Sequence, residues 1–280
     1  MVDLRTHLQR RGNDGSNRTL TPMETFPAQR IVCLTEETVE TLYLLGEDSR
    51  IVGVSGYAVR PARVRREKPR VSAFTSADIP KILALKPDLV LTFSDLQKGI
   101  AAELIGAGVA VHAFNQRTIA GILAMIRTVG ALVDARDRAE TLAAEYEARL
   151  AVVAADARAK PPVRVYFEEW DEPMISGIGW VSELITVAGG VDVFAALSKK
   201  QAAKDRIVSS QQVVAANPQV ILASWCGKKV VPKRMTERAG WGEIAAVRDG
   251  RIVEIKSPLI LQPGPAALSD GLDAIVKALG

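Results

Sequence analysis

The sequence predicts an α/β protein: two similar α/β sandwich lobes joined by a single long backbone helix, with a ligand cleft between the lobes. Short apolar runs alternate with helical patterns along most of the chain, which is typical of parallel strands covered by helices. The order of helix end, proline and apolar strand in ILALKPDLVL (82–91) returns in VVAANPQVIL (213–222). This punctuation is common in α/β proteins, so the repeat favours two related lobes without requiring them.

The first predicted lobe covers residues 30–134. Its strands are predicted at RIVCL (30–34), RIVGVS (50–55), DLVLTF (88–93) and VAVHAF (109–114). Helical patterns follow at 36–46, 77–87, 96–108 and 118–132. Pro80 suits the first turn of the second of these helices, and Pro87 ends it. Glu36 and Glu37 stand at the start of the first helix, where acidic residues suit the helix dipole.

A connecting helix is predicted over residues 135–160. The segment is rich in alanine, mixed in charge and free of glycine and proline until Pro161. About 25 residues at 1.5 Å each make a rod of roughly 37 Å, which is longer than a local crossover needs. The segment therefore predicts a helical spine between two lobes.

The second predicted lobe covers residues 161–280. Strands are predicted at VRVYFEE (163–169), QVILAS (219–224) and DGRIVEI (249–255), with helices at 180–190, 209–218 and 264–280. Ser209 or Ser210 is placed to cap the middle helix. In both lobes the strands carry their loops at their carboxyl ends, which is where open α/β sheets bind ligands.

Composition excludes several classes of function. The chain is 48% hydrophobic and 24% charged, and no run approaches the roughly 20 apolar residues of a membrane span. Its net charge of +4 is scattered, so no nucleic-acid partner is expected. Residues 1–29 are polar and lack a secretory signal, which predicts a disordered extension or non-native leader and a native start near Met23. This favours the cytoplasm, unless a signal peptide was replaced.

Motifs for catalysis and metal binding are missing from the sequence. It has no phosphate-binding loop and no nucleophile elbow, and its only histidines are His7 and His112. Cys33 and Cys226 stand alone, which predicts two free buried thiols and no metal site. His112 is predicted to be a strand histidine with an ordinary hydrogen bond, although a role as a cobalt ligand stays open. SGIG (176–179) precedes a helix; a plain loop is the simpler interpretation, and an anion site is the alternative. No enzymatic activity is predicted.

Scarce aromatic residues gather at predicted strand ends. Only 5% of the chain is aromatic, and about half of these residues are expected in the core. The positions are Tyr57, Phe74, Phe93, Phe114, Trp170, Trp180 and Trp225. An aromatic-lined cleft suits a large, flat, mostly uncharged ligand.

Four segments together carry a family resemblance: RIVCLTEETVETLYLLGEDSRIVGVS, PRVSAFTSADIPKILALKPDLVLTF, WVSELITVAGGVDVF and AAVRDGRIVEI. From about Arg30 to Gly280 the chain resembles the periplasmic binding proteins of cobalamin and iron-siderophore ABC importers, and most of all their cobalamin-binding branch. The resemblance implies a monomeric, periplasmic, bilobal protein with little hinge motion, without a cofactor, that binds cobalamin or a related corrinoid.

The resemblance also implies ligand-facing residues. Tyr57, Phe74 and Phe93 match aromatic positions of the family in the first lobe, and Phe194 matches one in the second. Trp180 and Trp225 are added as ligand-binding candidates because they follow strand ends. Relatives that dock on an ABC permease carry one surface acid per lobe, but Pro80 and Gln211 stand at those positions here. Losing both charges puts a permease partner in doubt.

Two alternatives remain open. A siderophore or haem would favour clustered arginines, for which Arg60, Arg63, Arg117 and Arg206 are candidates if they converge on the cleft. A metal-handling enzyme or chelatase-like subunit on the same scaffold would need metal-ligating Cys and His residues, of which this sequence has few.

Overall fold

The first lobe is built on a five-stranded parallel sheet. The computed structural model describes residues 26–280, so most of the predicted extension, including Met23, lies outside the described residues. The sheet order is β3-β2-β1-β4-β5. The strands are β1 (Ile31–Cys33), β2 (Ile51–Ser55), β3 (Arg70–Ser72), β4 (Leu89–Phe93) and β5 (Val111–Phe114). Every pairing is parallel, as the sequence predicts.

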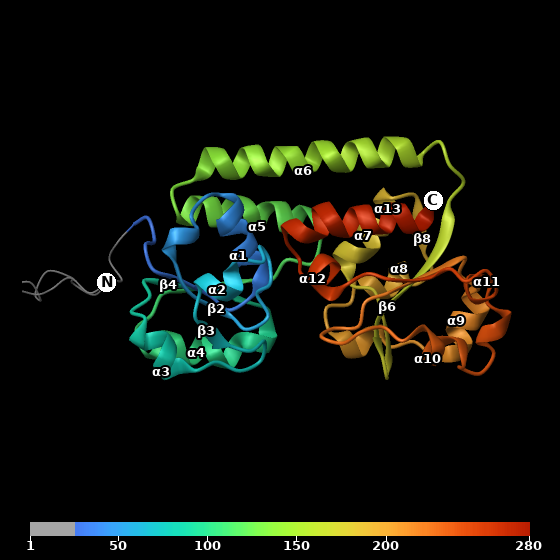
Figure 1. The fold of residues 1–280 in the computed structure, drawn as a ribbon, viewed down its shortest axis with the longest axis horizontal. Helices are drawn as coiled ribbons and strands as arrows, with labels where there is room; N and C mark the ends of the chain where they lie inside the picture. The colour runs from blue at the N-terminus through green and yellow to red at the C-terminus, as the bar shows by residue number, and fades with distance from the viewer. Residues whose placement is uncertain (1–25) are drawn as a thin grey trace, which may run out of the picture.

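Helices cover both faces of this sheet (Figure 1). They are α1 (Glu36–Leu44), α2 (Val64–Glu67), α3 (Ile79–Ala84), α4 (Lys98–Gly106) and α5 (Ile119–Leu132). Side chains cap two of them: Asp78 accepts from the Lys81 N–H at α3, and Thr118 accepts from the Gly121 N–H at α5. Such caps satisfy backbone N–H groups that the first turn leaves without a helical partner. Strand β3 and helix α2 are additions to the predicted elements.

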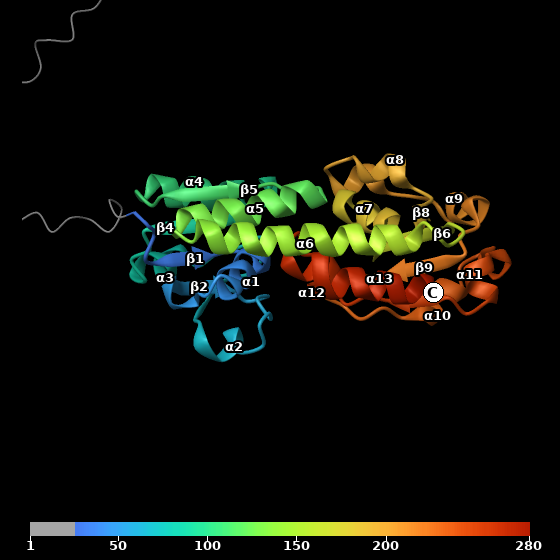
Figure 2. The same ribbon diagram turned by 90° about the horizontal axis from the view of Figure 1, so that it is seen from above.

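Helix α6 (Arg136–Ala157) joins the two lobes. Its 22 residues make a rod about 33 Å long, and it runs along both lobes (Figure 2). It packs against α5 and against α7 (Gly179–Val187) of the second lobe. The contact with α5 is close: a Cβ placed on Gly130 would lie 2.2 Å from the Ala139 Cβ.

The second lobe is built on a mixed sheet. The order is β10-β9-β6-β7, and β8 also pairs with β6. The strands are β6 (Val163–Asp171), β7 (Met174–Ser176), β8 (Gly190–Asp192), β9 (Val220–Ala223) and β10 (Ile252–Glu254). The expectation of purely parallel strands is wrong for β7, which pairs antiparallel with β6 because a tight turn at 172–173 reverses the chain.

The remaining helices of the second lobe are mostly short. They are α8 (Ala195–Ser198), α9 (Ser210–Ala216), α10 (Pro232–Thr236), α11 (Ala245–Arg248), α12 (Ser257–Ile260) and α13 (Leu272–Leu279). Ser209 caps α9 with a full capping box that includes Gln212. The single helix predicted over 264–280 is confirmed, since residues 265–279 are helical throughout, with a π-helical turn (Ala267–Gly271) leading directly into α13.

The repeated sequence is a repeated structure. Ile82 in α3 and Val213 in α9 are both fully buried, and strands β4 and β9 follow them. Lys86 and Asn217, each directly before a proline, both have a left-handed backbone with φ of 49° and 41°. The two lobes therefore leave the helix and enter the strand through the same turn.

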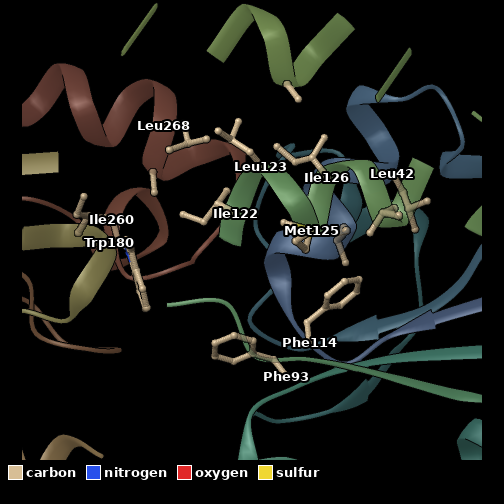
Figure 3. Close-up of a cluster of buried hydrophobic side chains, with 14 of the residues drawn as sticks. Leu42, Phe93, Phe114, Ile122, Leu123, Met125, Ile126, Trp180, Ile260 and Leu268 are labelled. Carbon is tan, nitrogen blue, oxygen red and sulfur yellow. Dashed lines mark hydrogen bonds between the residues drawn. The ribbon is translucent and has the colours of Figure 1, made fainter. Parts of the chain in front are cut away.

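One hydrophobic core runs from the first lobe into the second. Leu42 and Met125 belong to the same buried cluster as Trp180, Ile260 and Leu268 (Figure 3). The lobes therefore share packed apolar surface as well as the α6 connection.

Candidate ligand-binding site

The loops that follow the strands of the first sheet carry most of the predicted site. Tyr57 follows β2, Phe74 follows β3, and Phe93 is the last residue of β4. Parallel strands bring their carboxyl ends to one edge, so these aromatic residues come from neighbouring positions on that edge. Tyr57 is 52% exposed, whereas Phe93 is only 5% exposed.

The buried amide of Gln97 fixes this edge. Its side-chain oxygen accepts from the Phe93 N–H at 2.9 Å, and its side-chain nitrogen donates to the Leu34 carbonyl at 3.1 Å and the Phe74 carbonyl at 2.9 Å. One side chain thus ties together the ends of β1, β3 and β4. Gln97 was not predicted from the sequence, because nothing in its local pattern distinguishes a buried amide from a solvated one.

Arg117, in the loop after β5, lies over the Phe93 ring. Its guanidinium carbon is 4.7 Å from the ring centroid, a cation–π contact. The Phe93 ring points from the first lobe toward the second, where Trp180 lies (Figure 3). Partial burial lowers the pKa of Arg117, and the Asp95, Glu169 and Glu37 carboxylates act in the opposite direction. Carboxylates from both lobes therefore act on the pKa of Arg117.

Two acidic residues begin helix α1 inside the protein. Glu36 is 8% exposed and Glu37 is 1% exposed. Burial raises the pKa of Glu36 to about 7 and that of Glu37 to about 8, although the Thr35 hydroxyl donates to Glu37 at 2.6 Å. The predicted helix-dipole role is therefore incomplete, because burial brings the pKa values of both carboxyls close to neutral pH.

The second lobe contributes a buried ion pair. Arg206, 1% exposed, holds both Glu169 oxygens, with nitrogen–oxygen distances of 2.6 and 3.0 Å. Its backbone carbonyl accepts from the Ser176 hydroxyl at 3.0 Å. The Arg206 charge lowers the pKa of Arg117, whereas the Glu169 charge raises it, so both members of this ion pair act electrostatically on Arg117.

The other two candidate arginines have partners of their own. Arg60 pairs instead with Glu40 and Asp270, at 2.8 Å each. Arg63 lies over the Tyr43 ring at 4.7 Å. The predicted arginine cluster is therefore reduced to Arg117 and Arg206.

Phe194 and the two candidate tryptophans have packing roles in this structure. The Trp180 indole N–H donates to the Ile260 carbonyl at 2.8 Å, and the Trp225 indole N–H donates to Glu168 at 3.0 Å. Their exposed fractions are 3% and 1%. Phe194 is partly buried and meets the Tyr166 ring edge-on at 5.6 Å. Ligand contact by these residues remains a prediction.

Several polar contacts hold the lobes against each other. The Gln116 side chain donates to the Pro263 carbonyl at 2.9 Å, and the Ala266 N–H donates to Glu40 at 3.0 Å. A Cβ on Gly264 would lie 2.5 Å from the Glu37 Cβ, so glycine permits the close approach of the second lobe to α1. The site is therefore framed by contacting lobes.

Several buried polar atoms make no hydrogen bond among the described residues. They include Glu36 Oε2, Gln116 Oε1, Arg117 Nε and Arg206 Nε. Such atoms are rare in folded proteins, and each indicates a place where a polar partner is accommodated. They lie on the segments that carry the predicted site.

The predictions made for the two cysteines and for His112 are confirmed in part. Cys33 is a free buried thiol, and burial raises its pKa to about 12. Cys226 is free but exposed, so its predicted burial is wrong; it sits in the loop after β9, beyond the buried strand. His112 makes no hydrogen bond with any described residue, contrary to the prediction, because its ring packs 4.3 Å from Phe114 on the edge strand β5.

Within residues 26–280, no group of three or more His, Cys, Asp or Glu side chains could hold a metal ion. Over the same residues, no helix has both the length and the apolar character needed to cross a membrane.

Known proteins share this architecture. The family model described as periplasmic binding protein matches residues 31–259. A vitamin B12-binding protein of Vibrio cholerae is 26% identical over 246 residues, 87% of this chain and 86% of that protein. The crystal structure of the periplasmic vitamin B12-binding protein of Vibrio cholerae has a TM-score of 0.75 and 26% identity, covering 90% of this chain and 97% of its own. A periplasmic heme-binding protein of Roseiflexus sp. has a TM-score of 0.77 and 24% identity, covering 90% and 100%, which shows the shared fold.

Proposed function

The chain belongs to the periplasmic binding protein family, and on this basis we propose that it binds a corrinoid, in the simplest case cobalamin, between its two lobes. The observation that carries the proposal is the row of aromatic residues Tyr57, Phe74 and Phe93 on the edge that Gln97 fixes. Flat rings at neighbouring strand ends suit the wide face of a corrin. The similarity to vitamin B12-binding proteins over most of the chain supports the same ligand.

The family consists of binding proteins, and we propose binding without catalysis for this chain. Ligand contacts are assigned to Tyr57, Phe74, Phe93 and Phe194. Trp180 and Trp225 are assigned packing roles that stabilise the site. This division follows from the hydrogen bonds that both indole N–H groups donate to protein acceptors.

An ABC permease is the partner that the family implies. The positions of the two expected surface acids are occupied by Pro80 and by Gln211, which is exposed at the start of α9. Asp78, the nearest acid to Pro80, caps α3. We therefore propose that any docking of this protein on a permease depends on surface shape and on other polar groups. Charge pairs would then contribute less to aligning the two proteins.

A haem or ferric siderophore is the second candidate ligand. The observation that favours it is Arg117, which lies over Phe93 and has a buried Nε without a hydrogen bond among the described residues, since arginine recognises carboxylates well. The structural likeness to a heme-binding protein agrees with this candidate.

Titration of the purified protein with cobalamin, haem and a ferric siderophore in parallel tests the proposal. Tryptophan fluorescence and the visible spectrum of each ligand report binding. Micromolar or tighter binding of cobalamin, with weaker binding of the other two, supports the corrinoid assignment. Binding of haem or siderophore without cobalamin would replace it with the second candidate.

A further inference from the structure

A hollow of about 530 Å³ lies beside Arg117, between the loop after β5 and the helices α7 and α8. Asn115, Arg117 and Thr118 line one side, and residues of the second lobe line the other. The second-lobe residues that matter here are Gly179, Ser182, Lys199 and Lys200. The hollow thus adjoins the candidate site, because Arg117 borders it and also lies over Phe93.

Arg117 makes no hydrogen bond or ion pair with any described residue, and its Nε is buried without a partner. Of the three acids that act on Arg117, both Glu169 oxygens bind Arg206 and Glu37 accepts from Thr35, while Asp95 is exposed in the turn after β4. A guanidinium offers five N–H donors, so an unpaired one at a hollow is suited to an oxyanion.

The rest of the lining also favours negative charge. Lys199 and Lys200 are exposed and form no ion pair within the described part of the chain. The only acid in the lining, Glu183, accepts from the Ile119 N–H at 2.6 Å. Helix α7 begins at Gly179 without a side-chain cap or an acid in its first turn, so its N–H groups add positive potential. The lining therefore has three positively charged side chains, those of Arg117 and the two lysines, and only one carboxylate, which already accepts a hydrogen bond.

We propose that this hollow binds a peripheral oxyanion of the ligand, with Arg117 as the residue that selects for it. The inference rests on the proposed function. On a corrinoid the oxyanion is the phosphodiester of the nucleotide loop, and on a haem it is a propionate. The Arg117 guanidinium lies over Phe93, which faces the flat part of the ligand, and it also binds the oxyanion. The charge at the periphery of the ligand therefore helps to determine its affinity.

The first test compares cobalamin with cobinamide, which lacks the nucleotide loop and its phosphodiester. The wild-type protein should bind cobalamin about tenfold more tightly, the size of one charge-assisted contact. Arg117→Met should weaken cobalamin binding by that factor and leave cobinamide binding unchanged. Arg117→Lys should retain part of the preference, and the preference should shrink as salt rises.

Two controls separate charge at the hollow from general effects. Lys277→Met removes an exposed positive charge on α13, away from the hollow, and should leave both affinities unchanged. Lys199→Met with Lys200→Met removes exposed lining charges without touching the core, so it tests the hollow even if an Arg117 variant folds poorly. This pair should lower the preference severalfold.

Equal affinity of the wild type for cobalamin and cobinamide would overturn the proposal, as would an equal loss of both in Arg117→Met. If the wild type binds haem and no corrinoid, the proposed function fails while the oxyanion proposal is tested with haem against its dimethyl ester. Loss of a tenfold preference for haem in Arg117→Met would then support it, and no preference would refute it. A protein that binds neither corrinoid nor haem refutes both.

Discussion

The Gln97 side-chain oxygen accepts the Phe93 N–H at 2.9 Å, so a fully buried amide ties the last residue of β4 to the turn that follows it. The same amide reaches the backbone of two other strand ends. The edge that carries the predicted ligand contacts is thus held by one side chain.

Gln97→Leu should destabilise the protein and loosen the site. It leaves the buried Leu34 and Phe74 carbonyls and the Phe93 N–H without partners, at a cost of about 2–4 kcal/mol in the free energy of unfolding. Urea denaturation measures the loss, and ligand titration well below the transition measures the effect on binding. Unfolding free energy within about 0.5 kcal/mol of the wild type would contradict the role given to Gln97.

Tyr57→Ala should weaken ligand binding about tenfold without affecting stability. The side chain is 52% exposed at the edge of the site, so its removal opens no cavity. Calorimetric titration with the ligand gives the affinity, and thermal unfolding checks the fold. Ile105→Ala is the matched control, since Ile105 is 61% exposed on α4 and should leave affinity unchanged.

Trp225→Phe should lower stability more than affinity. The change removes the indole N–H that donates to Glu168, a carboxylate fully buried beside Arg238 and Tyr166. The expected cost is about 1–3 kcal/mol in the free energy of unfolding. A loss of ligand affinity above tenfold with unchanged stability would instead make Trp225 a ligand contact.

Gly130→Ala should destabilise the packing of α5 against α6. The new Cβ would lie 2.2 Å from the Ala139 Cβ, so the helices must separate, at a cost of about 1–3 kcal/mol. Gly99→Ala in α4 is the control, because no atom lies within 4 Å of its Cβ position. The control should be neutral or slightly stabilising. Equal stabilities for the two variants would contradict the close helix contact.

The stability of the protein should fall as pH rises from about 5 to 8. Burial raises the folded-state pKa of Glu36 to about 7 and of Glu37 to about 8, from an ordinary value of 4.5, so the folded state holds these protons more tightly. The stabilisation is complete below the unfolded pKa and is lost as pH rises through the folded values. Each group changes the free energy of unfolding by at most about 1.4 kcal/mol per pH unit.

Urea denaturation at several pH values measures this slope. Glu36→Gln with Glu37→Gln should flatten it, whereas Glu103→Gln, at an exposed position on α4, should not. Burial also raises the pKa of Glu40, Glu168 and Asp192, so a smaller slope should remain in the double variant. An unchanged slope in the double variant would contradict the protonation of the α1 acids.

Local patterns were sufficient to predict most elements of the fold. Strands β4 and β9 follow from apolar runs after a proline, and α6 follows from an unbroken helical composition. Short elements such as β7, with three residues, carry no period long enough to detect. The helix over 264–280 was predicted, but its π-helical turn at Ala267–Gly271 was not, because the sequence there continues an ordinary helical pattern.

The site was harder to predict because burial there depends on distant segments. Glu37 is covered where Gly264, far along the chain, approaches α1. Trp225 follows a strand, as a ligand-facing aromatic residue would, but its indole N–H donates to the buried Glu168. Arg117 lies over Phe93, while Arg60 pairs with Glu40 and Asp270. Sequence position identifies the edge of the sheet, and tertiary contacts decide which side chains remain at it.

Helix α6 has a consequence for the rates of ligand exchange. A continuous rod that packs on α5 and α7 at once resists rotation of one lobe against the other. Entry and departure of a ligand then depend on rearrangement of the loops at the strand ends, which proceeds faster than swinging of whole domains. Association should therefore follow a single exponential whose rate rises linearly with ligand concentration, and residence time should be set by the contacts at the loops.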